Sequence, residues 1–85
     1  MDEVTSVIAV TRRIDLPGMP EPMSPGDYRL TYGVEADPVD DRQVYYHGGE
    51  AVGLENHQRY RLWGYQVEAL LQSPHVSLVE LAAGS

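Results

Sequence analysis

Residues 28 to 34 alternate strictly between apolar and polar side chains, and this alternation constrains the fold more than any other feature of the chain. Successive side chains of an extended strand point to opposite faces of a sheet, so the pattern predicts a strand with one buried face. The apolar set on that face is Tyr28, Leu30, Tyr32 and Val34. Such a sheet needs a second layer over its apolar face, which favours a helix packed on a sheet.

Two further segments complete the N-terminal half of the predicted sheet. Residues 4 to 14 contain the continuous apolar run from Val7 to Val10, which predicts a strand buried on both faces. Residues 36 to 41 are rich in aspartate and contain a proline, so they predict a turn. This turn joins the alternating strand to a partner strand at residues 42 to 47 in an antiparallel hairpin.

An amphipathic helix is predicted after the glycines at 48 and 49, which are expected to end the partner strand, and spans residues 55 to 72. At 100° per residue, one helical face carries an apolar set and the opposite face a mainly polar set. The apolar set is Tyr60, Trp63, Val67, Leu70 and Leu71, and the polar set is Arg61, Tyr65, Glu68 and Gln72. The Ser-Pro pair at 73 and 74 ends the helix, and residues 75 to 81 predict a last strand.

Together these elements predict one α+β domain over residues 1–85, in the order β-β-β-α-β. We expect one amphipathic helix on a mostly antiparallel four-stranded sheet, with a right-handed crossover if the last strand lies parallel to the third. With no cysteine in the chain, packing has to stabilise the domain without disulfides. The chain begins with acidic residues and contains no apolar run of the ~18 residues that a membrane span needs, so we expect a cytoplasmic protein that does not contact membranes.

The loop at residues 15–26 holds four of the six prolines and two of the three methionines. So many missing N–H donors exclude a regular hydrogen-bonded ladder. Two roles fit the apolar residues Leu16, Met19 and Met23. They form an adaptable surface for a partner, or they anchor the loop over the second face of the sheet.

The charge balance selects among classes of partner. Thirteen acidic residues face six bases, all of them arginine, which gives a net charge of −7. Nucleic-acid binding depends on clustered Lys and Arg, so direct binding to nucleic acid is disfavoured. An acidic surface instead favours a protein partner with a basic surface, and nucleic-acid-handling proteins form a large class of such partners.

No set of residues has the spacing of a known catalytic or cofactor site, and we expect no enzyme activity, no metal and no cofactor. One weak candidate is a metal-binding site formed by His47, Glu50 and His57, because two imidazoles and a carboxylate are suitable ligands for iron or zinc. Nothing in the predicted elements brings these three side chains to one point. The glycines at 48, 49 and 53 resemble a phosphate-binding loop in texture only, since the Lys and the Ser or Thr of such a loop are missing.

The residues that suit a protein partner come from three segments. Tyrosine and arginine are common in interfaces because they combine large contact areas with polar atoms, and methionines adapt to irregular surfaces. Ordinary solvation of an acidic turn and of a helix surface remains the simpler explanation for several of these residues. The candidates are Asp37, Asp40 and Asp41 in the turn, Tyr45 beside it, Arg61 and Tyr65 on the outer helix face, and Met19 and Met23 in the loop.

In size and charge the chain is similar to the small proteins that phages use to block host machinery, anti-CRISPR proteins among them. This resemblance implies an inhibitor or adaptor that occludes a basic surface of a host protein. The alternative is a self-assembling phage structural or accessory component, in which an uncovered sheet face or an edge strand pairs with another copy. A homodimer is compatible with either reading, and a small metal-dependent enzyme is the third hypothesis.

Overall fold

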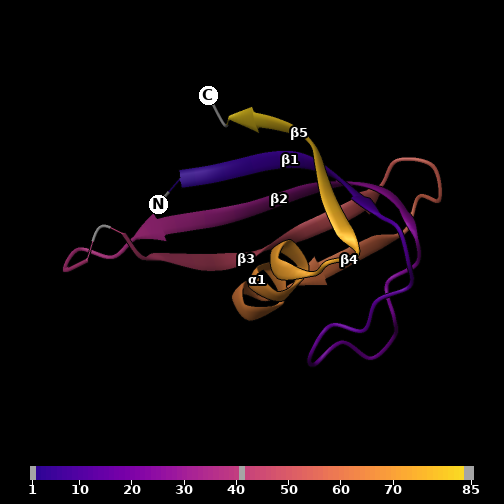
Figure 1. Ribbon diagram of the computed structural model, residues 1–85, viewed down its shortest axis with the longest axis horizontal. Coiled ribbons are helices and arrows are strands. Elements are labelled where there is room, and N and C mark those ends of the chain that lie inside the picture. The colour runs from indigo at the N-terminus through magenta and orange to yellow at the C-terminus, as the bar shows by residue number, and fades with distance from the viewer. Residues whose placement is uncertain (1, 41, 84–85) are drawn as a thin grey trace.

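The computed structural model describes residues 2–40 and 42–83 and shows a helix packed on an antiparallel sheet (Figure 1). The predicted α+β class is confirmed, with five strands in place of four. The elements in chain order are β1 (Asp2–Val10), β2 (Gly26–Ala36), β3 (Val44–Gly53), β4 (Arg59–Leu62), α1 (Gly64–Gln72) and β5 (Val76–Ala83). No helix in the described ranges is long and apolar enough to cross a membrane.

The sheet has the order β4-β3-β2-β1-β5, and every neighbouring pair is antiparallel. The first four strands form a meander. After α1 the chain returns to the far edge, where β5 lies beside β1. The last strand, β5, therefore runs antiparallel to β3. The right-handed crossover was predicted only for a last strand parallel to the third, and this condition is not met. The meander leaves the outer edge of β1 free for β5.

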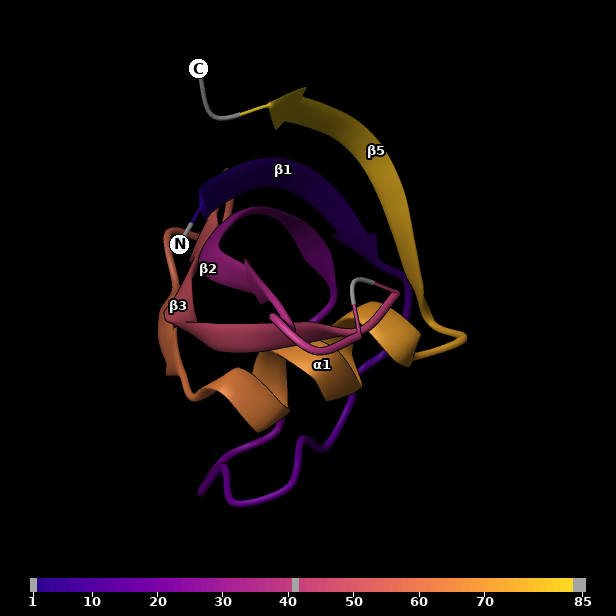
Figure 2. The ribbon, with the colours of Figure 1, turned by 90° about the vertical axis from the view of Figure 1, so that its left-hand side faces the viewer.

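One face of the sheet carries the hydrophobic core, as the alternation in β2 predicts. Tyr28 and Leu30 are fully buried on this face, and the register places Ile8 opposite Tyr28 on β1. Val67 and Leu70 of the helix complete this part of the core. Figure 2 shows α1 beneath the curved sheet, on this side.

The apolar run in β1 is buried on one face only, which corrects the expectation of burial on both. Ile8 and Val10 are buried in the core, whereas Val7 and Ala9 on the opposite face are half-buried. No layer of helix or loop among the described residues covers that opposite face. Antiparallel sheets commonly have one face in water, so a short apolar run does not require two covered faces.

The prediction of a helix from residue 55 is wrong. Residues 54 to 58 form a turn, β4 follows, and the helix begins only at Gly64. In β4, Leu62 faces the core and is buried, and Tyr60 packs edge-on against Tyr28 with ring centroids 5.9 Å apart. The side chains of β4 thus follow the period of two of a strand, although their spacing also fits one face of a helix. Trp63 precedes the helix and is 69% exposed, so it is not part of the predicted buried face.

The glycines at 48 and 49 do not end β3, which continues to Gly53. A Cβ atom on Gly49 would lie 1.8 Å from the carbonyl oxygen of Thr31, closer than any side chain tolerates. Gly49 therefore permits the close approach of β2 and β3. The two glycines therefore mark a place where β2 and β3 pack closely, and not the end of a strand.

The Pro- and Met-rich loop packs on the same face of the sheet as the helix. Ile14 and Met23 exchange two backbone hydrogen bonds, of 3.1 and 2.8 Å. Gln66 of α1 donates from Nε2 to the carbonyl oxygen of Pro17 at 2.9 Å. Leu16 and Met23 are buried with the core. Of the two roles considered for the loop, its apolar residues therefore anchor it, but on the helix side of the sheet and not over the second face.

Candidate protein-binding surface

The hairpin between β2 and β3 extends beyond the rest of the sheet and carries the predicted acidic turn (Figure 1). The carboxylate of Asp37 accepts hydrogen bonds from the backbone N–H of Val39 at 2.8 Å and from the hydroxyl of Tyr45 at 2.9 Å. These two bonds, that from Val39 first, hold the pKa of Asp37 below its usual value. The turn is thus fixed by its own side chains.

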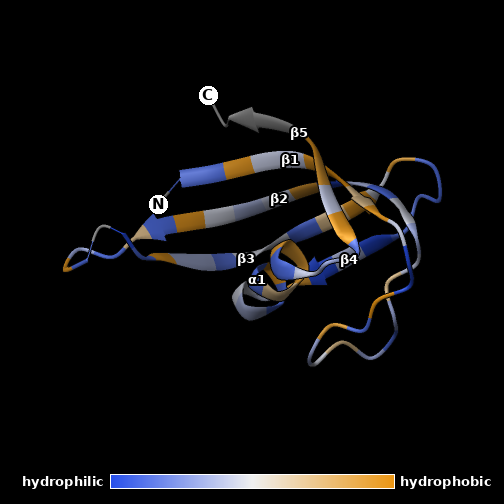
Figure 3. Ribbon diagram, in the orientation of Figure 1, coloured by the Kyte–Doolittle hydropathy of each residue, from blue (hydrophilic) through white to orange (hydrophobic). Residues whose placement is uncertain are grey.

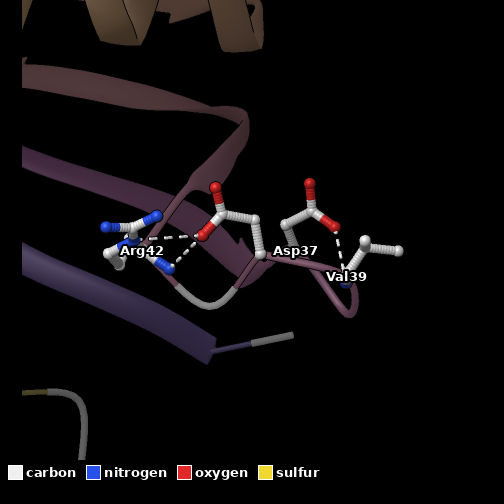
Figure 4. Close-up of polar contacts among 4 residues, drawn as sticks. Asp37, Val39 and Arg42 are labelled. Atoms are coloured by element: carbon white, nitrogen blue, oxygen red, sulfur yellow. Dashed lines mark hydrogen bonds and ion pairs between the residues drawn. The ribbon is translucent and has the colours of Figure 1, made fainter.

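The tip of the hairpin combines charge with exposed apolar surface. Asp40 accepts a hydrogen bond from the backbone N–H of Arg42 at 3.1 Å and lies 3.5 Å from its guanidinium Nε (Figure 4). Val39 is 94% exposed, and Tyr45 is 54% exposed. The hairpin is mostly hydrophilic with a hydrophobic point at its tip (Figure 3). Asp41 lies outside the described residues.

A hollow lies at the base of this hairpin, where β2 and β3 carry glycines. Gly33, Gly48 and Gly49 line it without side chains to fill it. The polar and aromatic lining includes Asp2, Glu3, His47, Glu50, Arg61 and Trp63. His47 in the lining of the hollow lies next to the hairpin, with its Nε2 3.1 Å from Oε2 of Glu35. We call the hairpin and the hollow together the acidic strip.

The acidic strip is strongly unbalanced in charge. Among the described residues, the hairpin and the hollow carry six carboxylates against two guanidinium groups, those of Arg42 and Arg61. The carboxylates are Asp2, Glu3, Glu35, Asp37, Asp40 and Glu50. Arg59, next to the strip, pairs with Glu50 at 3.6 Å. The strip therefore presents a negative potential to an approaching molecule.

The structure separates the three residues of the candidate metal-binding site. His47 and Glu50 both line the hollow, whereas His57 lies in the turn between β3 and β4, where its φ is 60°. Within residues 2–40 and 42–83, no cluster of three His, Cys, Asp or Glu side chains is arranged to hold a metal ion.

The other predicted partner-binding residues are dispersed. Arg61 lies on β4 and lines the hollow, but Tyr65 lies on α1, where its hydroxyl is close to Gly18 of the loop. They are not a pair on one helix face as predicted. Met19 is half-buried against the core, and Met23 is fully buried, so Met23 cannot contact a partner without unfolding the loop.

The sequence patterns did not predict that Trp63 is exposed, nor that glycines line a hollow. The spacing of Trp63 from Val67 and Leu70 fits one face of a helix, which predicts a buried side chain. The alternation of Arg59, Tyr60, Arg61 and Leu62 is the signal that places a strand just before it.

Comparison of the chain with protein-family models, curated protein sequences and solved structures finds no match.

Proposed function

We propose that this protein is a non-enzymatic binding module that attaches to a basic surface of another protein through the acidic strip. The observation that carries the proposal is the hairpin tip, where exposed Val39 and Tyr45 stand among carboxylates. Apolar contact area supplies affinity, and the surrounding charges select a basic partner and accelerate the encounter.

The local hydrogen bonds of the hairpin support this proposal. A surface that is already ordered loses less conformational entropy when it binds. Asp37 ties the turn to the following strand through Tyr45, and Asp40 ties it to Arg42. Exposed Trp63 at the hollow adds an aromatic side chain of the type that dominates binding energies in interfaces.

Nucleic-acid-handling proteins are the class of partner that the charge favours, because their binding sites concentrate Lys and Arg. An acidic strip that covers such a site keeps nucleic acid out by occupying its surface. The small size and the charge of −7 support the narrower proposal of a phage-type inhibitor or adaptor.

The test is a capture experiment with two variants of equal charge. The hairpin variant carries Asp37→Asn and Asp40→Asn, and the control carries Glu21→Gln and Glu55→Gln at exposed positions outside the strip. Both changes reduce the net charge from −7 to −5. The immobilised proteins are incubated with lysate proteins that were first selected on phosphocellulose, a matrix that retains basic nucleic-acid-binding proteins.

We expect the wild type and the control to retain the same protein in a stoichiometric amount, and the hairpin variant to lose it. Retention should also fall as salt rises from 50 to 200 mM, because the attraction is screened over about 10 Å. Equal retention by the hairpin variant and the control, or retention that salt does not change, would contradict the proposal.

A further inference from the structure

The strand β5 forms one edge of the sheet and offers more backbone for pairing with another strand than β4 at the other edge. It pairs with β1 on one side only, and it runs for eight residues from Val76 to Ala83. Leu78 and Val79 are 60% and 61% exposed. The coloured part of β5 in Figure 3 is mostly hydrophobic, with one pale band. An edge of this kind presents unpaired backbone groups beside exposed apolar side chains.

The two edges of the sheet differ in their protection. Edge strands commonly avoid pairing with other chains by being short, by carrying charges or by containing proline. The edge strand β4 has four residues and carries Arg59 and Arg61. The first half of β5, from Val76 to Val79, has no charged residue and no proline. Its register against β1 shifts between Val7 and Ile8, which makes Val79 the extra residue of a bulge. This bulge and the charge of Glu80 are the protection of this longer edge.

We propose that β5 pairs with β5 of a second copy of this chain, in antiparallel orientation about a two-fold axis, so that one sheet continues across both copies. Strand length favours this partner over β4 of another copy. Pairing of β5 with β5 uses up to eight residues, whereas β4 offers four. Two-fold pairing also closes the assembly, because each copy uses its edge once.

The charges at the two ends of β1 favour the same arrangement. The end of β5 lies at the start of β1, since Ala83 is opposite Val4, and Asp2 and Glu3 precede that position. The start of β5 lies at the other end of β1, which leads into exposed Arg12 and Arg13. A two-fold axis through β5 reverses one copy. The end of the sheet that carries Asp2 and Glu3 in one copy then lies on the same side as the end that leads into Arg12 and Arg13 in the other copy. The two acidic hairpins are far apart in this arrangement.

The first experiment measures mass in solution by light scattering after size exclusion, for the wild type, Val79→Lys and Val39→Lys. Val39 is the matched control because it is also an exposed valine, at the hairpin tip. We expect dimers for the wild type and for Val39→Lys. We expect a dissociation constant raised about tenfold or more for Val79→Lys, because a lysine on an open edge strand opposes pairing with another strand.

The second experiment uses the absence of cysteine from the natural chain. A single cysteine introduced as Val79→Cys lies near the proposed axis, and the control is Val39→Cys. Disulfides need Cα atoms within about 7 Å, so we expect oxidation to link the Val79→Cys copies rapidly and the control copies slowly. Circular dichroism of each variant confirms that it is folded.

Each other outcome overturns the proposal. A wild-type monomer at 100 µM would show that β5 does not pair with itself. Open filaments or larger rings would show head-to-tail pairing of β5 with β4. A dimer that Val79→Lys leaves intact, with equal rates of disulfide formation for both cysteine variants, would place the interface elsewhere. These outcomes do not depend on the capture experiment, which tests the acidic strip.

Discussion

Replacing Met23 by alanine tests whether the Pro- and Met-rich loop belongs to the core. Met23 is 0% exposed and belongs to the same buried core cluster as Ile14, Leu16 and Tyr28. Removal of a fully buried methionine loses the transfer free energy of its side chain and leaves a cavity, at a cost of about 2–5 kcal/mol. Because a loop without regular secondary structure can collapse partly into the space, we expect a value of about 3 kcal/mol.

The matched control is Met19→Ala, in the same loop. Met19 is half-buried at the margin of the core, so its loss should cost about 1 kcal/mol. For a domain of this size, about 3 kcal/mol corresponds to a fall in melting temperature of about 12–24 °C. Urea denaturation followed by circular dichroism measures both free energies of unfolding, and a thermal scan measures the melting temperatures.

Equal and small effects of the two substitutions would refute this reasoning. An exposed residue typically changes the free energy of unfolding by no more than about 0.5 kcal/mol. If Met23→Ala falls within that range, the loop does not pack on the sheet, and Met23 becomes available to a partner. A cost near 3 kcal/mol, with an effect of Met19→Ala about a third as large, supports the anchored loop.

Three further predictions concern single polar groups. Gln66→Leu should cost about 1–3 kcal/mol in urea denaturation, because its buried amide joins the helix start to the loop, and no change would refute that role. Ser6→Ala should stabilise the fold by about 1 kcal/mol, since the buried Oγ has no hydrogen-bond partner among the described residues, and a loss of stability would show that it has one. Tyr45→Phe should raise the pKa of Asp37, seen by NMR titration of its carboxyl carbon, and an unchanged value would contradict the hydrogen bond. Because the pKa of Asp37 is lowered on folding, its contribution to stability exists above the unfolded pKa and disappears as pH falls through the folded value.

The candidate surface was predictable in part. Local sequence indicated the acidic turn, because Asp37 and Asp40 bond to backbone groups two residues away. The hollow depends on residues from four strands, among them Glu3, Gly33 and Arg61. Those residues meet only through the register of the sheet, which no local pattern reveals.

The sequence by itself determined the α+β class, the apolar face of β2, the hairpin that follows it and the end of the helix at Ser73. Each of these follows from contacts within a few residues, such as side-chain alternation or the effect of proline on its neighbour. Only the tertiary structure decided that residues 59 to 62 form a strand, because cross-strand pairing with β3 overrides a spacing that also fits a helix. It also decided which face the loop covers, since buried Met23 is placed by packing against the helix and β2, and a proline-rich segment has no periodicity that would reveal its direction.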